Sequence, residues 1–275
     1  MGRRTVRRNV VRWTPDGTSH RPDTLAAEEP LEIRIDGAAF TVTMRTPGDD
    51  IDLVHGFLAS EGIIRGREDV RTARYCAGAT DGDANTYNVI DVELAAGAAT
   101  ARPSRNVLTT SACGVCGRTT IDEVRTRSPY DLRADAIRWD ARLLCTLPDA
   151  LRRAQTVFDR TGGLHAAGLF GAGSDAPLVV REDVGRHNAV DKVVGWALRE
   201  DRLPATGAVL VVSGRASYEL VQKAVIAGIP ALVAVSAPSS LAVELALETG
   251  LTLVGFARGQ SMNVYAGGQR LGLVG

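Results

Sequence analysis

The chain has 275 residues, of which 45% are hydrophobic and 23% charged, the composition of an ordinary globular protein. Its 32 basic residues balance its 32 acidic ones, so no overall field draws it to nucleic acid or to an anionic membrane. The longest apolar runs are far shorter than the roughly 20 residues that a transmembrane helix needs, and no apolar stretch follows the basic start. We therefore expect a soluble, cytoplasmic protein that binds neither nucleic acid nor membrane.

The N-terminal part divides into an arm and a β-rich subdomain. The first twelve residues carry five arginines and no acid, and residues 1–28 show little periodicity, which predicts a flexible basic arm. Apolar residues alternate on both sides of Asp36-Gly37 and predict a β-hairpin over 32–44. A helix follows from about 46–50 to Gly62, and then a strand near 86–94.

The C-terminal part reads as alternating strands and helices, which predicts an α/β fold with a mostly parallel sheet covered by helices. In such sheets ligands bind beyond the carboxyl ends of the strands, which selects the loops 213–217, 236–240 and 257–261. The expected organisation has four parts: a basic arm (1–28), a smaller β-rich N-terminal subdomain (29–105), a cysteine-bearing loop and linker (106–147) and the α/β domain (148–275).

The predicted linker contains a pair of cysteines, Cys113 and Cys116, at C-x-x-C spacing. A structural zinc site needs two more ligands, and Cys76 and Cys145 each stand alone. A thioredoxin-like site usually has a restricting residue between the cysteines, whereas Gly114-Val115 stands here. Two thiols on a turn by coincidence, and a sulfur relay with one cysteine carried as a persulfide, also remain open. The spacing favours the sulfur relay.

The segment 161–167 (TGGLHAA) suggests the histidine motif of zinc-dependent nucleoside deaminases. Those enzymes need an acid two residues after the histidine and a C-x-x-C further along the chain. Here Ala167 follows His165 at that spacing, and the cysteine pair comes about 50 residues earlier. The sheet resembles that of a deaminase, but the deaminase chemistry is absent.

Polar residues concentrate in the stretch 181–192 (REDVGRHNAVDK), between a predicted strand and a predicted helix. Asp183 is positioned to cap the helix, and Arg186 and His187 to face a ligand. A solvated helix start is the alternative. We interpret the stretch as part of a binding site.

Two loops at the same predicted sheet edge carry an arginine. Ser213-Gly214-Arg215 precedes a helix, where phosphate is commonly held, and Arg258 follows the last main strand. No Walker motif occurs, which argues against ATP hydrolysis. Together the loops predict a large phosphorylated or nucleotide-bearing ligand.

Taken together, the motifs 111–117, 161–167, 181–192 and 256–261 resemble the formate dehydrogenase accessory sulfurtransferase family, FdhD. The resemblance runs from about residue 28 to the C-terminus and implies a C-terminal domain similar in fold to cytidine deaminases. It implies a sulfur carrier that accepts a persulfide from a cysteine desulfurase and passes sulfur to the bis-molybdopterin guanine dinucleotide cofactor of formate dehydrogenase. It also implies a homodimer.

By the same resemblance Cys113 bears the persulfide and Cys116 assists, with no tightly bound metal of the protein's own. The expected cofactor-binding residues are those of the C-terminal segment and the loops described above: Phe256, Ala257, Arg258, Gly259, Gln260, Ser261, Ser213, Gly214, Arg215, His187 and Asp183. The alternatives are a non-catalytic chaperone for the guanine dinucleotide cofactor and a zinc-stabilised binding module.

Overall fold

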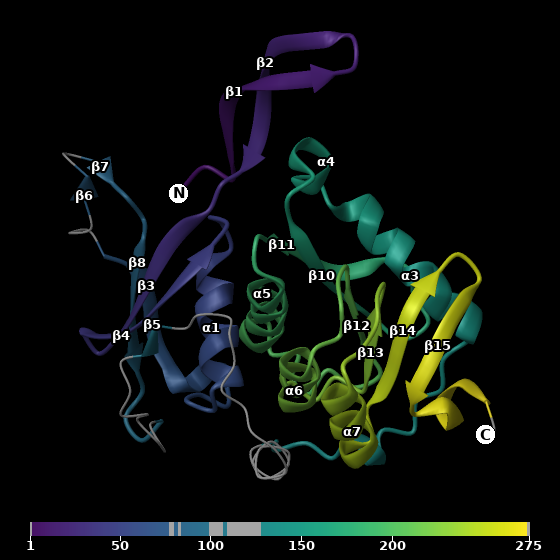
Figure 1. The fold of residues 1–275 in the computed structure, drawn as a ribbon. Helices are drawn as coiled ribbons and strands as arrows, with labels where there is room; N and C mark the ends of the chain where they lie inside the picture. The colour runs from purple at the N-terminus through teal and green to yellow at the C-terminus, as the bar shows by residue number, and fades with distance from the viewer. Residues whose placement is uncertain (1, 77–79, 82–83, 99–106, 109–127, 274–275) are drawn as a thin grey trace.

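The computed structural model describes residues 2–76, 80–81, 84–98, 107–108 and 128–273. Cys113 and Cys116, and with them the predicted persulfide site, lie outside these described residues. The two subdomains that flank the cysteine segment are both described, and Figure 1 shows them side by side.

Residues 5–26 form a β-hairpin where the sequence predicted a flexible arm. β1 (Thr5–Thr14) pairs antiparallel with β2 (Gly17–Ala26) in a sheet of their own, from Thr5 opposite Ala26 to Thr14 opposite Gly17. The turn residues Pro15-Asp16 followed by a glycine at φ +138° allow the tight reversal. Most side chains of the hairpin are exposed, so the apolar alternation that normally signals a strand is weak here.

The N-terminal subdomain is a five-stranded sheet in the order β5-β8-β3-β4-β9, with helix α1 (Asp50–Ser60) packed on it. The predicted hairpin is confirmed, with its turn at Asp36-Gly37. Leu31, Ile33 and Ile90 of the sheet are fully buried against α1. The strands are β3 (Glu29–Ile35), β4 (Ala38–Arg45), β5 (Val70–Tyr75), β8 (Val89–Leu94) and β9 (Val107–Leu108), with a short separate pair β6 (Thr80–Asp81) and β7 (Ala84–Asn85) and a 3₁₀ turn Arg67–Asp69.

The C-terminal subdomain is a six-stranded sheet in the order β11-β10-β12-β13-β14-β15. The α/β class and the β-rich N-terminal subdomain are confirmed, but the sheet is mixed where a mostly parallel one was predicted. Only β12–β13 and β13–β14 are parallel, and the other three neighbouring pairs are antiparallel. The strands are β10 (His165–Phe170), β11 (Pro177–Asp183), β12 (Val209–Val212), β13 (Ala231–Ala234), β14 (Thr252–Arg258) and β15 (Ser261–Ala266).

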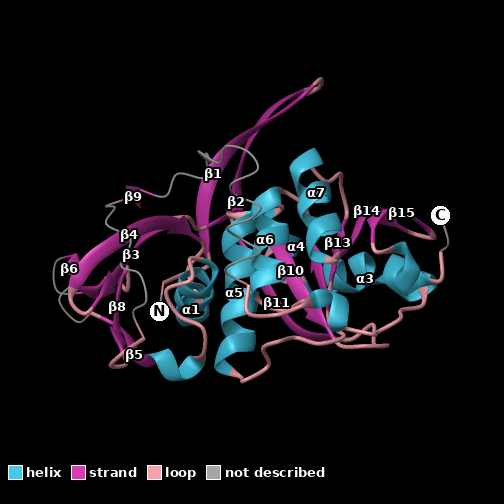
Figure 2. Cartoon of the chain, turned by 90° about the horizontal axis from the view of Figure 1, so that it is seen from below, coloured by secondary structure: helices cyan, strands magenta, loops and turns pink. Residues whose placement is uncertain are grey.

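Helices cover both faces of this sheet (Figure 2). Alternate strand residues point to opposite faces, so Leu210 and Leu232 pack under α5, α6 and α7, while Val211 and Val233 pack under α3. The helices are α3 (Ala141–Ala154), α4 (Phe158–Thr161), α5 (Arg186–Arg199), α6 (Tyr218–Ile226) and α7 (Ser240–Thr249), with 3₁₀ turns Leu132–Ala134 and Gly268–Leu271. Among the described residues, no helix is long and apolar enough to cross a membrane.

The two subdomains meet where α1 crosses α5 with no side chain between the two backbones. A Cβ atom at Gly56 would lie 1.8 Å from the carbonyl oxygen of Asp191, and one at Gly195 would lie 1.8 Å from that of Asp52. Only glycine fits at such a crossing. The close approach lets buried ion pairs form beside it, including Asp52 with Arg181 at 2.7 Å.

Candidate functional site

A cleft of about 510 Å³ lies at the carboxyl edge of the parallel strands β12, β13 and β14. One wall is the C-terminal half of α3, which contains Pro148. The apolar spacing of the sequence predicts a helix from Pro148, and α3 begins seven residues earlier, at Ala141. The other walls are the segment leading into β10 and the ends of the strands. The lining residues are Pro148, Asp149, Leu151, Arg152, Gln155, Phe158, Gly162, Gly163, Leu164, His165, Val184, Ser213, Val235, Ala257 and Arg258.

Three of the predicted cofactor-binding residues line this cleft: Ser213, Ala257 and Arg258. The Ser213 hydroxyl accepts a hydrogen bond from the Ala166 amide at 2.9 Å, and the Ser213 amide donates to the Ala166 carbonyl at 3.0 Å. These bonds tie the loop after β12 to the start of β10. Gly214 is close by, because a Cβ there would lie 3.5 Å from His165 Nδ1.

The other residues of the predicted C-terminal segment are not among the lining residues of this cleft. β14 ends at Arg258 and β15 begins at Ser261, so the expected loop is the tip of a β-hairpin. Gly259, Gln260 and Ser261 line a second cavity of about 740 Å³. Arg215 is exposed and is not among the lining residues of either cavity.

His165 stands at the first position of β10, on the floor of the cleft. Burial lowers the pKa of its imidazole, and the positive charge of Arg186 lowers it further. The ring is therefore neutral at pH 7. A neutral imidazole retains one N–H donor and one acceptor nitrogen, so His165 offers both functions to a bound ligand.

The rim of the cleft carries two arginines from different elements. Arg152 of α3 lies over the ring of Phe158 at 4.7 Å and pairs with Asp159 at 2.5 Å. Arg258 ends β14 and is exposed. Two guanidinium groups above a floor that contains Gly162 and Gly163 suit a phosphate-bearing ligand. The sequence analysis did not select Arg152 and Phe158 as site residues. Their position just before the 161–167 motif is the signal that could have identified them.

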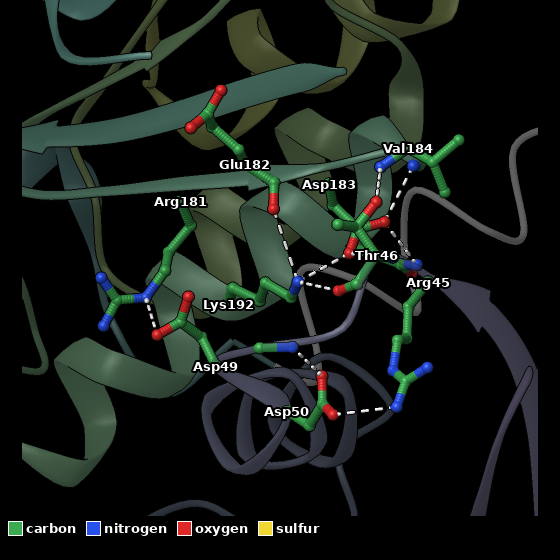
Figure 3. Close-up of polar contacts among 12 residues, drawn as sticks. Arg45, Thr46, Asp49, Asp50, Arg181, Glu182, Asp183, Val184 and Lys192 are labelled. Atoms are coloured by element: carbon green, nitrogen blue, oxygen red, sulfur yellow. Dashed lines mark hydrogen bonds and ion pairs between the residues drawn. The ribbon is translucent and has the colours of Figure 1, made fainter. Parts of the chain in front are cut away.

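Asp183 is the centre of a buried latch, which we define as the contacts between Thr46 and residues 182–192 (Figure 3). Its carboxylate is fully buried and pairs with Lys192 Nζ at 2.7 Å. It also accepts hydrogen bonds from the amides of Thr46 at 3.1 Å and Gly185 at 2.9 Å. With these partners its carboxylate is engaged at the subdomain boundary, and Asp183 is not among the lining residues of the cleft. These contacts give Asp183 a structural role, and its cofactor contact stays a prediction.

The neighbouring residues of the latch serve the same boundary. Lys192 Nζ donates to the Thr46 carbonyl at 2.9 Å, and the Val184 amide donates to the Thr46 hydroxyl at 3.1 Å. Glu182 turns the other way, because its carboxylate accepts from the amides of Val157 at 2.9 Å and Phe158 at 2.7 Å. The polar density of 181–192 is explained mostly by packing of the subdomains and by attachment of α4.

His187 lies in the first turn of α5 and pairs with Glu219 at the start of α6, at 3.0 Å. The Ser217 hydroxyl donates to the same Glu219 oxygen at 3.1 Å. These residues join the starts of two helices, and none of them is among the lining residues of the cleft.

The two cysteines that the structure describes are Cys76 and Cys145. Cys145 is buried in α3, and burial raises the pKa of its thiol, so it packs as a small hydrophobic side chain. No group of three or more histidine, cysteine, aspartate or glutamate side chains in the described ranges could hold a metal ion.

Comparisons with known proteins identify the family. The FdhD/NarQ family model matches residues 26–272, so the chain belongs to this family. It is 64% identical to the sulfur carrier protein FdhD of Nocardia farcinica over 98% of this chain and 96% of that protein. It is 59% identical to the sulfur carrier protein FdhD of Streptomyces coelicolor over 99% of this chain and 98% of that protein.

A solved structure shares the fold. The crystal structure of a putative formate dehydrogenase accessory protein from Desulfotalea psychrophila matches with a TM-score of 0.75 at 24% identity, over 97% of this chain and 99% of that one. Both subdomains therefore occur together in that protein.

Proposed function

We propose that this chain is a sulfur carrier, a sulfurtransferase that accepts a persulfide from a cysteine desulfurase and passes sulfur to the bis-molybdopterin guanine dinucleotide cofactor needed by formate dehydrogenase. The main support is that the chain is 64% identical to a sulfur carrier protein and has a cleft with two arginines at its sheet edge. The proposal includes a homodimer in the cytoplasm, as the family resemblance implies.

The cofactor is the cargo of this reaction, and the cleft suits one end of it. A volume of about 510 Å³ falls within the roughly 300–1,000 Å³ of small-molecule sites and suits a single nucleotide. Arg152 and Arg258 would meet the phosphates, and the neutral His165 would donate or accept a hydrogen bond. Leu151, Leu164 and the other apolar lining residues would contact the base or ribose.

The sulfur step needs one thiolate. Cys113 attacks the outer sulfur of the desulfurase persulfide, so a new S–S bond forms at Cys113 as the bond to the desulfurase cysteine breaks. That cysteine leaves as a thiolate. Cys113 then carries the outer sulfur as a persulfide. On transfer the S–S bond at Cys113 would break, Cys113 would leave as a thiolate, and the cofactor would supply the electron pair for its new bond to sulfur, with Cys116 assisting.

Mass spectrometry tests the carrier step directly. After incubation with desulfurase and cysteine, we expect the chain to gain one sulfur, about 32 Da, that reducing agent removes. Cys113→Ala should abolish the gain. An adduct that survives this substitution would contradict the assignment to Cys113, and full formate dehydrogenase activation by a Cys113→Ala, Cys116→Ala variant would favour a non-catalytic chaperone.

Nucleotide binding tests the cleft. With GDP as the probe, Arg258→Ala should weaken binding about 10- to 100-fold, because a hydrogen bond to a charged group contributes roughly 1.5–3 kcal/mol. Arg215→Ala is the matched control, because Arg215 is an exposed arginine outside the cleft lining. Equal losses at both positions would refute the assignment of the nucleotide to this cleft.

A further inference from the structure

The β1–β2 hairpin has no part in the cleft and projects from the body of the molecule (Figures 1 and 2). Residues 2–26 contain six arginines and only two acidic residues. A two-stranded ribbon without a core of its own is marginally stable in water. A protein that maintains such a ribbon, with this charge, has a reason to present it.

The two faces of the hairpin differ in chemistry. Residues two apart share a face, so Val11 and Trp13 lie together, and the register sets His20 opposite Val11 on that face. Trp13 is 72% exposed and Val11 59%. Arg12 and Arg21 lie on the opposite face by the same alternation. The outer end of the hairpin therefore presents Trp13 and Val11, with His20, on one side and the two arginines, with Val10 between them, on the other.

The hairpin rises from the rim of the cleft. A Cβ at Gly163, a lining residue, would lie 3.7 Å from the Cβ of Ala26 at the end of β2. The base is held by a hydrogen bond from the Ala27 amide to the Arg4 carbonyl at 2.9 Å and by the ion pair of Arg4 with Asp49. The hairpin is thereby fixed at its base beside the cleft, while its outer end, which carries Arg12, Trp13 and Arg21, extends away from the body of the molecule (Figure 1).

Tryptophan and arginine are the side chains most enriched among the residues that dominate binding energy at protein interfaces. Duplex nucleic acid fits the hairpin less well, because its phosphate backbone offers no apolar contact to Trp13 and Val11, and Asp23 stands opposite Arg8 in the register. An acidic protein surface with an apolar depression would satisfy both faces.

We propose that the β1–β2 hairpin is the docking surface for the protein that donates sulfur, with Trp13 as its apolar anchor and Arg12 and Arg21 as its charge contacts. This inference rests on the proposed function. Of the two partner proteins in the proposed function, the donor has to dock on this chain for sulfur uptake, whereas formate dehydrogenase receives the cofactor only after the sulfur has been passed on. The donor must present acidic residues around the depression that receives Trp13.

Binding of the full chain to purified cysteine desulfurase from the same organism, measured by calorimetry without cysteine, tests the proposal. We expect Trp13→Ser to weaken the Kd at least tenfold, as for other dominant interface residues. Arg12→Glu/Arg21→Glu should weaken it similarly and reduce its salt dependence. Arg65→Glu/Arg153→Glu makes the same charge change at exposed positions outside the hairpin and should stay within about twofold.

A second measurement separates this proposal from the proposed function. Cys113 is loaded with sulfur from a small-molecule persulfide, and the mass of the protein is then measured. This loading does not need docking of the desulfurase. The hairpin variants should load as wild type does, with unchanged thermal unfolding. If wild type loads but the hairpin variants bind desulfurase as tightly as wild type, the docking proposal is overturned while the carrier function stands. If wild type takes up no sulfur from either donor, the proposed function itself fails.

Other partners give distinct results that would also overturn the docking proposal. Binding of duplex DNA or of phosphatidylserine vesicles lost in Trp13→Ser, with desulfurase binding unchanged, would assign the hairpin to those partners. A loss of self-association in ultracentrifugation, again with desulfurase binding unchanged, would assign it to a second copy of the chain.

Discussion

Replacing Gly56 by alanine probes the contact that joins the two subdomains. The new Cβ would lie 1.8 Å from the Asp191 carbonyl oxygen, 2.6 Å from its carbonyl carbon and 2.8 Å from the Gly195 amide nitrogen. All three are backbone atoms, so no side chain can rotate away. Because Cβ atoms do not approach other heavy atoms closer than about 3 Å, α1 and α5 must separate by roughly 1 Å or more.

The energetic cost follows from that displacement. Overpacking in a well-packed core costs about 1–3 kcal/mol and sometimes more, and here the contacts beside the crossing also lengthen. Those include the hydrogen bond from Ser60 to Asp191 at 3.0 Å and the pairing of Asp52 with Arg181. Alanine regains about 1 kcal/mol of helix propensity. We expect a net loss of about 2–4 kcal/mol, or a fall in Tm of roughly 4–12 °C for a chain of this size.

Urea unfolding and calorimetry measure this loss. Gly171→Ala is the control, because a Cβ at Gly171 would meet only Leu178 at 3.9 Å, and it should be nearly neutral. Gly56→Ala/Gly195→Ala should cost less than the two single changes together, since the first one already separates the helices. A Gly56→Ala protein within about 0.5 kcal/mol of wild type would refute the close crossing.

Three further predictions concern buried charge. Lys192→Met leaves the Asp183 carboxylate buried without its cation and should lower the free energy of unfolding in urea by about 3–5 kcal/mol. The double variant Lys192→Met/Asp183→Asn should recover part of this loss, and no recovery would refute the assignment of the loss to an unpaired buried charge. Glu182→Gln cannot accept from both amides at the start of α4, so hydrogen exchange of those amides should speed up while α7 amides stay unchanged. Burial lowers the pKa of His55, so it is neutral in both states above about pH 6.5, and stability should fall as pH drops below that value, where only the unfolded state readily takes up the proton. His55→Gln should flatten the urea-unfolding profile between about pH 7 and 5, and an unchanged slope would contradict this reasoning.

Hydrophobic periodicity predicted most helices and strands of the C-terminal subdomain, because each buries one apolar face. It could not give strand direction. β10 and β11 form an antiparallel hairpin and β10 also runs antiparallel to β12, and nothing in an apolar run states which way its neighbour points. The apolar spacing of Leu151, Ala154, Val157 and Phe158 predicts a helix over 148–160, but it does not locate the first turn. In the structure Asp140 caps the helix one turn or more earlier, accepting from the Arg142 amide at 2.8 Å.

The candidate site was predicted in part. Ser213 and Arg258 lie at strand ends, where the topology of an α/β sheet places ligands, and both line the cleft. Asp183 has the residue type of a ligand contact, but its role depends on Thr46, 137 residues earlier in the chain. Sequence proximity carries no information about such a partner. The hairpin was missed for a related reason, because its strands face solvent on both sides.

The latch connects the wall of the cleft to the N-terminal subdomain. Val184 lines the cleft, and its amide is held by the hydroxyl of Thr46, the residue directly after β4 ends at Arg45. β4 in turn pairs with β9, from which the chain continues toward the two cysteines. β9 is therefore connected to the cleft wall by its pairing with β4 and by the hydrogen bond between Thr46 and Val184. An excised C-terminal fragment would lose the hydrogen bond between Thr46 and Val184, so the wall of the cleft depends on both subdomains.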